Sequence, residues 1–358
     1  MRRRIGLIPA AIVLLAVSVR GSPRAAIQQP QSGSAGYRLK VDVNSVLLNV
    51  SVRDRVKGHG IQHLRKEDFL VYEDGTLQQV DQLLASDAPF SSLLLIDNSG
   101  STRSLLALMK QAAIEFTRQL NSNDQVAVAT FNSLVELVQD FTDDRALASR
   151  AIGSISSIGG TALYDALMTC IDTYMRGMTE RSAIVVFTDG VDNQLEGQNT
   201  EGSRTPFSQL YRRIQEIDPI IYSIFLDTEL DASAGRARSG PGLDPGIGWP
   251  FPRPRSRPAP AQTPSSDRRI HDKARDQLAT IADQTGGRMY PLTRAEQLVR
   301  VYMEIAEDLR IQYLLAYTPR GHARDGMWHD VQVRVKDRPD VAVRTRRGYY
   351  AQKTQDGR

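Results

Sequence analysis

Ser92-Leu-Leu-Leu-Ile96-Asp97-Asn-Ser99-Gly-Ser101 is the stretch that decides the fold of this 358-residue chain. It begins with an unbroken apolar run, whereas a strand with one solvent-exposed face would alternate between apolar and polar residues. Unbroken runs are typical of strands that are covered on both faces in a parallel sheet. The stretch therefore predicts a central parallel strand that ends at Asp97.

Strands and helices alternate along the chain after this stretch. Because such alternation brings parallel strands together with helices between them, it predicts an α/β fold over residues 89–318. We expect a doubly wound, mainly parallel sheet with helices on both faces. The expected strands lie at 125–131, 135–141, 182–187, 220–226 and 289–292, and the expected helices at 105–116, 146–155, 162–178, 207–217, 270–285 and 295–311.

Residues 230–269 interrupt this pattern with eight prolines among Arg, Gly and Ser. A packed loop of this length is uncommon, so we expect a disordered insertion.

Alternating apolar residues flank the α/β region on both sides. Alternation over residues 37–56, with further strands at 68–75 and 79–84, predicts a small N-terminal all-β module at 37–88. Strands at 313–318, 331–335 and 341–345 predict a β cover, whose last part is a C-terminal β extension at 319–358.

The first residues are typical of a signal peptide, which we place at 1–21. Three arginines precede the apolar run Ile5–Val19, which is shorter than a comfortable membrane span. An uncleaved anchor is the alternative, and residues 22–36 are expected to form a flexible spacer. Both interpretations predict an exported protein, located in the periplasm, at the envelope or outside the cell. The single cysteine, Cys170, cannot form an intramolecular disulfide.

Net charge gives no support for a nucleic-acid partner. The formal charge of +4 falls to about zero if Arg2, Arg3, Arg4 and Arg20 are removed with the signal peptide. Residues 90–228 carry 10 Lys/Arg and 17 Asp/Glu, a balance of −7, whereas the tail from Pro319 carries ten Lys/Arg and five Asp, a balance of +5. This tail either pairs with the acidic domain or contacts anionic envelope surfaces.

Three separate segments of the sequence, residues 97–101, 159–161 and 188–190, are expected at one edge of the sheet. Two of them follow predicted strands and one precedes a predicted helix. Open parallel sheets bind ligands at the edge formed by the carboxyl ends of their strands. Each alone could simply cap a helix or end a strand. Together they present only hard oxygen donors, which suit Mg²⁺ or Mn²⁺. The candidate metal-site residues are Asp97, Ser99, Ser101, Thr161 and Asp189.

This combination resembles the metal-ion-dependent adhesion site (MIDAS) of von Willebrand factor type A (VWFA) domains, whose Rossmann-like fold agrees with the predicted one. The flanking motifs Lys66-Glu-Asp-Phe69, Tyr72-Glu-Asp-Gly75 and Arg347-Gly-Tyr-Tyr350 resemble those of exported VWFA-related proteins of acidobacteria. The resemblance implies that Ser99 and Ser101 ligate the cation directly, that Thr161 does so when a ligand is engaged, and that Asp97 and Asp189 act largely through water.

The sequence thus predicts a non-enzymatic, adhesion-type module in which an Asp or Glu of a protein partner completes the coordination of Mg²⁺. Two alternatives stay open: a Mg²⁺-dependent hydrolase or phosphotransferase, and a metal-independent structural scaffold of the envelope. A hydrolase needs a base near the cation. His271, His322 and His329 are isolated in the sequence, and none of them is expected at the sheet edge.

Overall fold

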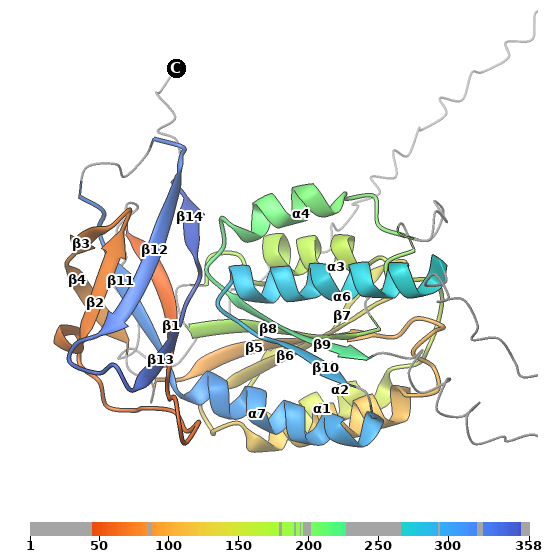
Figure 1. Cartoon of the computed structure of the whole chain (residues 1–358). Helices are drawn as coiled ribbons and strands as arrows, with labels where there is room; N and C mark the ends of the chain where they lie inside the picture. The colour runs from red at the N-terminus through yellow and green to blue at the C-terminus, as the bar shows by residue number, and fades with distance from the viewer. Residues whose placement is uncertain are drawn as a thin grey trace, which may run out of the picture. The chain divides into compact units, whose positions relative to one another are not determined.

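The computed structural model describes residues 45–84, 88–178, 181–189, 191–193, 195, 202–226, 266–292, 294–320 and 325–351 (Figure 1). The predicted signal peptide and spacer, and the insertion as far as residue 265, lie outside the described residues. None of the helices in the described part of the chain combines the length and the apolar character that crossing a membrane requires.

A six-stranded sheet forms the centre of the α/β region, in the order β10-β9-β8-β5-β6-β7. All neighbouring strands are parallel except β7, which runs antiparallel to β6 at the edge. The mainly parallel sheet predicted from the sequence is therefore confirmed. The strands are β5 (Phe90–Asp97), β6 (Gln125–Phe131), β7 (Val135–Thr142), β8 (Arg181–Thr188), β9 (Ile220–Leu226) and β10 (Met289–Leu292).

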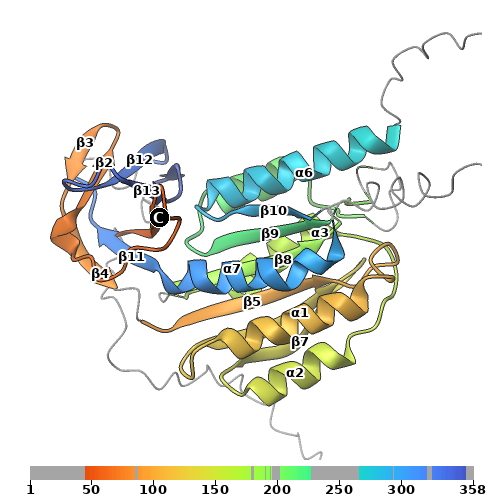
Figure 2. The same ribbon diagram turned by 60° about the horizontal axis from the view of Figure 1, so that its bottom comes forward.

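Helices cover both faces of this sheet, as Figures 1 and 2 show. One face carries α1 (Leu106–Gln119), α2 (Arg145–Ser154) and α7 (Leu298–Arg310), the last preceded by the 3₁₀ turn η3 (Ala295–Gln297). The other face carries α3 (Leu163–Thr169), α4 (Phe207–Ile214) and α6 (Ser266–Gln284). The helix α6 starts four residues before the expected helix and takes in the end of the predicted insertion.

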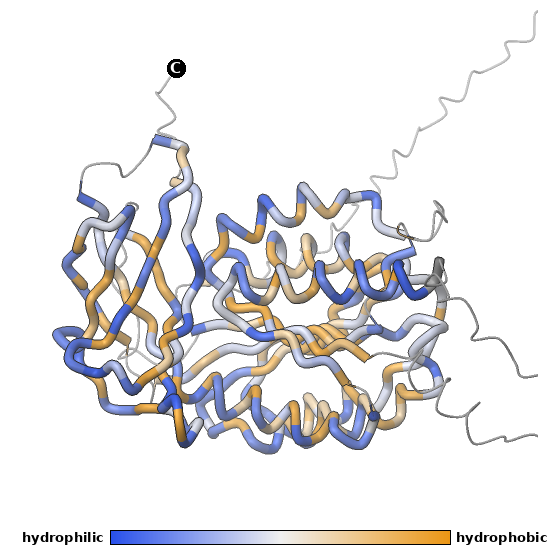
Figure 3. The backbone as a smooth tube through the Cα atoms, viewed as in Figure 1, coloured by the Kyte–Doolittle hydropathy of each residue, from blue (hydrophilic) through white to orange (hydrophobic). Residues whose placement is uncertain are grey.

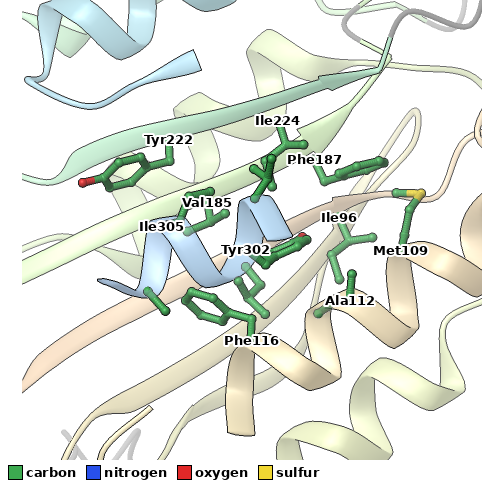
Figure 4. Packing of buried hydrophobic residues seen from close by; sticks show 14 of the residues in the cluster. Ile96, Met109, Ala112, Phe116, Val185, Phe187, Tyr222, Ile224, Tyr302 and Ile305 are labelled. Atoms are coloured by element: carbon green, nitrogen blue, oxygen red, sulfur yellow. The ribbon is translucent and has the colours of Figure 1, made fainter. Parts of the chain in front are cut away.

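Each face of the sheet has its own apolar core, and Figure 3 shows hydrophobic residues concentrated along the central strands. On the face covered by α1 and α7, the rings of Phe116 and Tyr302 pack with centroids 5.6 Å apart (Figure 4). Both side chains are fully buried, together with Ile96 from β5. The apolar run that predicted this strand is therefore explained by burial from both sides.

The helix predicted at 162–178 is shorter and less regular than expected. The α-helix α3 ends at Thr169 and continues as a π-helical turn, η2 (Cys170–Tyr174), after which Met175 N–H donates to Cys170 O at 2.9 Å. The wider turn carries two consecutive buried residues, Cys170 and Ile171. Hydrophobic periodicity cannot separate one such turn from a continuous α-helix.

The predicted N-terminal module and C-terminal extension combine into one β-sandwich of two four-stranded sheets, β13-β1-β11-β4 and β14-β12-β2-β3. Residues of both sheets share one apolar core. Strands from before the α/β region therefore pair with strands from after it. The strands are β1 (Val46–Asp54), β2 (Phe69–Glu73, preceded by the 3₁₀ turn η1, Lys66–Asp68), β3 (Thr76–Gln78), β4 (Val80–Leu84), β11 (Gln312–Tyr317), β12 (Trp328–Val335), β13 (Val341–Arg344) and β14 (Gly348–Tyr350).

Two of the three flanking motifs, residues 72–75 and 347–350, meet inside this sandwich. Glu73 of β2 is buried, and its Oε2 accepts hydrogen bonds from the hydroxyls of Tyr317 at 2.5 Å and Tyr349 at 2.9 Å. A buried carboxylate needs such partners to replace water. The motif residues Glu73 and Tyr349 therefore have a structural role in the sandwich.

His329 of β12 is held between two aspartates in the same sandwich. Its Nδ1 lies 2.7 Å from Asp74 Oδ2 and its Nε2 lies 3.1 Å from Asp325 Oδ1. Burial by itself lowers the pKa of His329, but the hydrogen bonds to Asp74 and Asp325 outweigh it and hold the pKa above 6.5. The histidine that looked isolated in the sequence is thus a paired group.

Asp308 of α7 joins the sandwich to the α/β region. Its Oδ1 accepts from Arg53 Nε at 2.9 Å, Arg53 Nη2 at 2.6 Å and Ser51 Oγ at 3.2 Å, and its Oδ2 accepts from Tyr222 OH at 2.6 Å. Asn49 Nδ2 also donates to the backbone oxygen of Asp218, just before β9, at 2.6 Å. The sandwich therefore contacts the amino ends of the parallel strands, and their carboxyl ends lie on the opposite side (Figure 1).

Candidate metal centre

Asp97 is the last residue of β5, at the carboxyl end of the central sheet, and its side chain is fully buried. Its Oδ1 accepts the backbone N–H of Ser99 at 2.9 Å, and its Oδ2 accepts the Thr188 hydroxyl at 2.7 Å. Thr188 ends β8, which pairs with β5. Asp97 thereby joins the ends of two neighbouring strands.

The two serines after Asp97 place their hydroxyls side by side. Ser99 Oγ and Ser101 Oγ lie 3.0 Å apart. The buried Thr102 hydroxyl donates to Asp97 O at 3.0 Å and to Ser99 O at 3.2 Å, so that the turn before α1 is held in one conformation. Ser99 is buried, whereas Ser101 is exposed. The cluster is therefore open to solvent on the side of Ser101.

The glycine-containing loop at 156–161 packs directly against this turn. Ile158 N–H donates to Asn98 O at 2.8 Å, and Gly100 N–H donates to Gly159 O at 3.0 Å. The Ser157 hydroxyl adds a third bond, to Ser99 O at 2.7 Å. Gly159 has a φ of +79°, a conformation that side chains with a Cβ rarely adopt, so the loop requires glycine here.

The chain that leaves β8 is hydrogen-bonded to both of the other predicted segments. The Thr188 hydroxyl donates to Asp97 Oδ2, and Asn193 N–H, just beyond the predicted segment, donates to Thr161 O at 3.0 Å. Asp189 is 3% exposed, and burial raises the pKa of its carboxyl, with a hydrogen bond from the Ser101 side chain acting in the opposite direction. The structure thus brings the loops of all five predicted site residues together at one sheet edge.

Ionisation of both carboxylates in this cluster, Asp97 and Asp189, is energetically unfavourable. Burial raises the pKa of Asp97 to about 7, and the neighbouring charge of Asp189 adds to the effect. Burial also raises the pKa of Asp189. Two buried carboxylates disfavour each other's ionisation, and a nearby cation reverses this. The pair is therefore suited to a positive ion.

Several residues that support the loops were missed by sequence reasoning. Asn132 Nδ2 donates to Asn98 Oδ1 at 3.2 Å, which links the β6–β7 turn to the site. The buried Asp192 accepts from Tyr164 N at 3.2 Å, from Ser203 N at 3.0 Å and from Ser203 Oγ at 2.6 Å. Asn98 and Asp192 are close to recognised motif residues in the sequence, but nothing in the pattern reveals their partners.

His271 lies nearer to the site than the sequence suggested. It belongs to the first turns of α6, and its electrostatic effect on Asp189 opposes the burial that raises the pKa of that carboxyl. Its Nδ1 is buried and has no hydrogen-bond partner among the described residues. Sequence reasoning left His271 out of the site. Topology nevertheless directs the start of α6 towards the carboxyl edge, because the chain leaves β9 there and the next helix must begin near it.

The donor set fits a hard divalent cation. It consists of two carboxylates and three hydroxyls, all of them oxygen, as Mg²⁺ and Mn²⁺ prefer. Among the described residues, no group of three or more His, Cys, Asp or Glu is arranged to hold a metal. A cation at this edge would therefore need further ligands besides the two carboxylates, and the serine and threonine hydroxyls are candidates.

Residues 92–191 match the family model of the von Willebrand factor type A domain. This segment runs from β5 to just beyond Asp189 and contains all five predicted site residues. The chain therefore contains a von Willebrand factor type A domain. No curated protein sequence matches the chain.

Solved structures with a similar fold share little sequence with this chain. The von Willebrand domain of the type V pilus tip protein Mfa5 from Porphyromonas gingivalis is 12% identical, with a TM-score of 0.43, over 63% of this chain and 96% of that one. A von Willebrand factor type A protein from Catenulispora acidiphila is 14% identical, with a TM-score of 0.44, over 88% and 76%. Proximal thread matrix protein 1 from the mussel byssus, solved with a zinc-occupied MIDAS motif, is 14% identical, with a TM-score of 0.43, over 64% and 47%. These similarities concern the fold alone.

Proposed function

We propose that this protein is a non-enzymatic, cation-dependent protein-binding module. Mg²⁺ or Mn²⁺ would be held directly by the hydroxyls of Ser99, Ser101 and Thr161, with Asp97 and Asp189 acting largely through water. A bound cation supplies a positive centre for an anionic ligand. The observation that carries the proposal is the hydrogen-bonded convergence of three loops around two buried carboxylates.

The partner's contribution follows from charge and exposure. The proposed direct ligands are neutral hydroxyls, and the two carboxylates act through water and balance the ion only while both are ionised. The coordination sphere itself therefore lacks a directly bound negative group. Ser101 is exposed, so a side chain from another protein can reach the ion from that side. An Asp or Glu of a protein partner is the ligand that completes such a sphere.

The place of action is proposed from the N-terminal sequence. The basic start and the apolar run Ile5–Val19 support export to the periplasm, the envelope or the exterior. In such a compartment the module would mediate adhesion or assembly. The narrower similarity to the acidobacterial group of exported proteins stays a prediction.

Cation-dependent stability tests the proposal directly. We expect Mg²⁺ or Mn²⁺ to raise the melting temperature of the full chain and EDTA to reverse this, because a ligand that binds only the native state stabilises it. Asp97→Ala should abolish the response, whereas Glu136→Ala, which removes an exposed carboxylate of β7, should preserve it. An identical response in wild type and Asp97→Ala would reject the site.

The position of His271 keeps one alternative worth testing. A Mg²⁺-dependent hydrolase needs a base near the ion, and His271 is a histidine with an electrostatic effect on Asp189. Turnover of a phosphoester panel that disappears in both Asp189→Ala and His271→Ala would favour hydrolysis over binding. Capture of a partner from envelope extract that is indifferent to EDTA would instead favour a metal-independent scaffold.

A further inference from the structure

Two large apolar side chains stand exposed beside the proposed cation site. Leu134 is 78% exposed and Ile158 is 61% exposed. Few large hydrophobic side chains among the described residues are as exposed as these two, which lie on different loops. We call them the apolar rim.

Hydrogen bonds connect both rim residues to the site. Ile158 N–H donates to Asn98 O at 2.8 Å, in the turn that carries the two serines. Leu134 lies in the β6–β7 turn, where its N–H donates to Asn132 Oδ1 at 3.0 Å and its O accepts from Asn132 N at 3.0 Å. In the same turn, Ser133 Oγ accepts from Gly160 N at 3.2 Å. The two exposed rim side chains therefore lie in turns that hydrogen bonds hold against the loops of the site.

The surface between the rim and the open hydroxyl of Ser101 carries little side-chain bulk. Gly100 and Gly159 are both exposed, and Gly100 N–H donates to Gly159 O. A partner backbone can thus approach closely, with the proposed cation to favour an acidic residue and the apolar side chains of the rim next to it.

We infer that the apolar rim selects the partner: the site binds a peptide segment in which an Asp or Glu is accompanied, within a few residues, by large apolar side chains. This inference rests on the proposed function and specifies its ligand. The acidic residue would reach the cation, and its apolar neighbours would cover Leu134 and Ile158. Exposed apolar side chains beside a polar anchor are a recurrent feature of recognition surfaces.

The probe is a displayed library of short random peptides with a fixed Glu, bound to the immobilised full chain in Mg²⁺ or Mn²⁺ and eluted with EDTA. Three proteins are compared: wild type, the rim variant Leu134→Ser/Ile158→Ser, and the matched control Val56→Ser/Leu77→Ser. The control removes two exposed apolar side chains of the sandwich, which are 92% and 53% exposed. Because all four side chains are exposed, we expect every protein to fold and to keep its Mg²⁺-dependent melting shift.

We expect Leu, Ile, Phe or Met to be enriched near the Glu in peptides eluted from wild type and from the control, but not from the rim variant. A selected peptide should bind the rim variant about ten-fold more weakly, because burial of apolar area would be lost. Glu peptides without apolar neighbours, or the same enrichment in the rim variant, would overturn the inference while leaving the proposed function standing. If EDTA releases no peptide from wild type, the proposed function fails and this inference fails with it.

Discussion

The buried junction at Asp308 provides a quantitative test of how the sandwich is fastened to the von Willebrand domain. Asp308→Ala removes the acceptor of hydrogen bonds from Ser51, Arg53 and Tyr222. Removing one partner of a fully buried ion pair costs about 3–5 kcal/mol. The Arg53 side chain is 21% exposed and can regain some water, which lowers the cost, whereas Tyr222 is fully buried and cannot. We therefore expect a loss of about 3 kcal/mol in the free energy of unfolding.

Urea denaturation of the full chain measures this loss, and Asp283→Ala is the matched control. Asp283 also pairs with an arginine, Arg347, but their side chains are 55% and 72% exposed. Exposed pairs contribute less than about 1 kcal/mol, so the control should be almost neutral. A cost for Asp308→Ala that does not exceed the cost of the control would refute the reasoning.

A double-mutant cycle separates the contribution of Tyr222 to stability from that of Arg53. Tyr222→Phe alone should be destabilising, because it removes a partner of Asp308 and the acceptor of Gln312 Nε2. In the background of Asp308→Ala the same change should cost about 1–2 kcal/mol less, because the hydroxyl has already lost its charged partner. Additive costs would show that the 2.6 Å contact between Tyr222 and Asp308 contributes nothing specific.

Three further predictions follow from buried or crowded positions. The raised pKa of His329 contributes stability that is complete below pH 6.5 and is lost as pH rises through the folded-state pKa. Melting temperatures at about pH 6 and about pH 9 should show this loss, and Asp74→Asn should flatten it. Gly287→Ala should destabilise by about 1–3 kcal/mol, because a Cβ would lie 2.1 Å from a backbone oxygen of β9; Gly153→Ala, with no atom within 4 Å, is the control in the same urea assay. Burial raises the pKa of Cys170 to about 12, so a thiol reagent at about pH 8 should label it only after unfolding; labelling of the native protein would contradict its burial.

The local hydrophobic pattern of the sequence was sufficient to predict those strands whose residues are buried on both faces. The strands at 125–131, 220–226 and 289–292 have the bounds that the sequence predicted. Their apolar runs reflect burial on both faces, which the sequence records directly. The convergence of residues 97–101, 159–161 and 188–189 was also predictable, because parallel strands place their carboxyl ends at one edge.

Pairing between distant segments was not predictable in the same way. Strand patterns at the two ends of the chain indicated β structure, but nothing in them shows that β1 pairs with β11 and β13, or β2 with β12. The short strands β3 and β14 have too few residues for a periodic signal. At the site, the approach of His271 and the exposure of Leu134 and Ile158 depend on how loops pack, which a linear pattern does not encode.

The divided origin of the sandwich has a consequence for how the protein is made. Glu73 and Tyr349, which share a hydrogen bond, are 276 positions apart, with the von Willebrand domain between them. As the polypeptide leaves the ribosome, β1 to β4 emerge first, and the edges that later pair with the last strands stay unpaired until those strands are made. A stalled or shortened chain would therefore present open strands that can pair with other molecules, rather than a protein that has merely lost its tail.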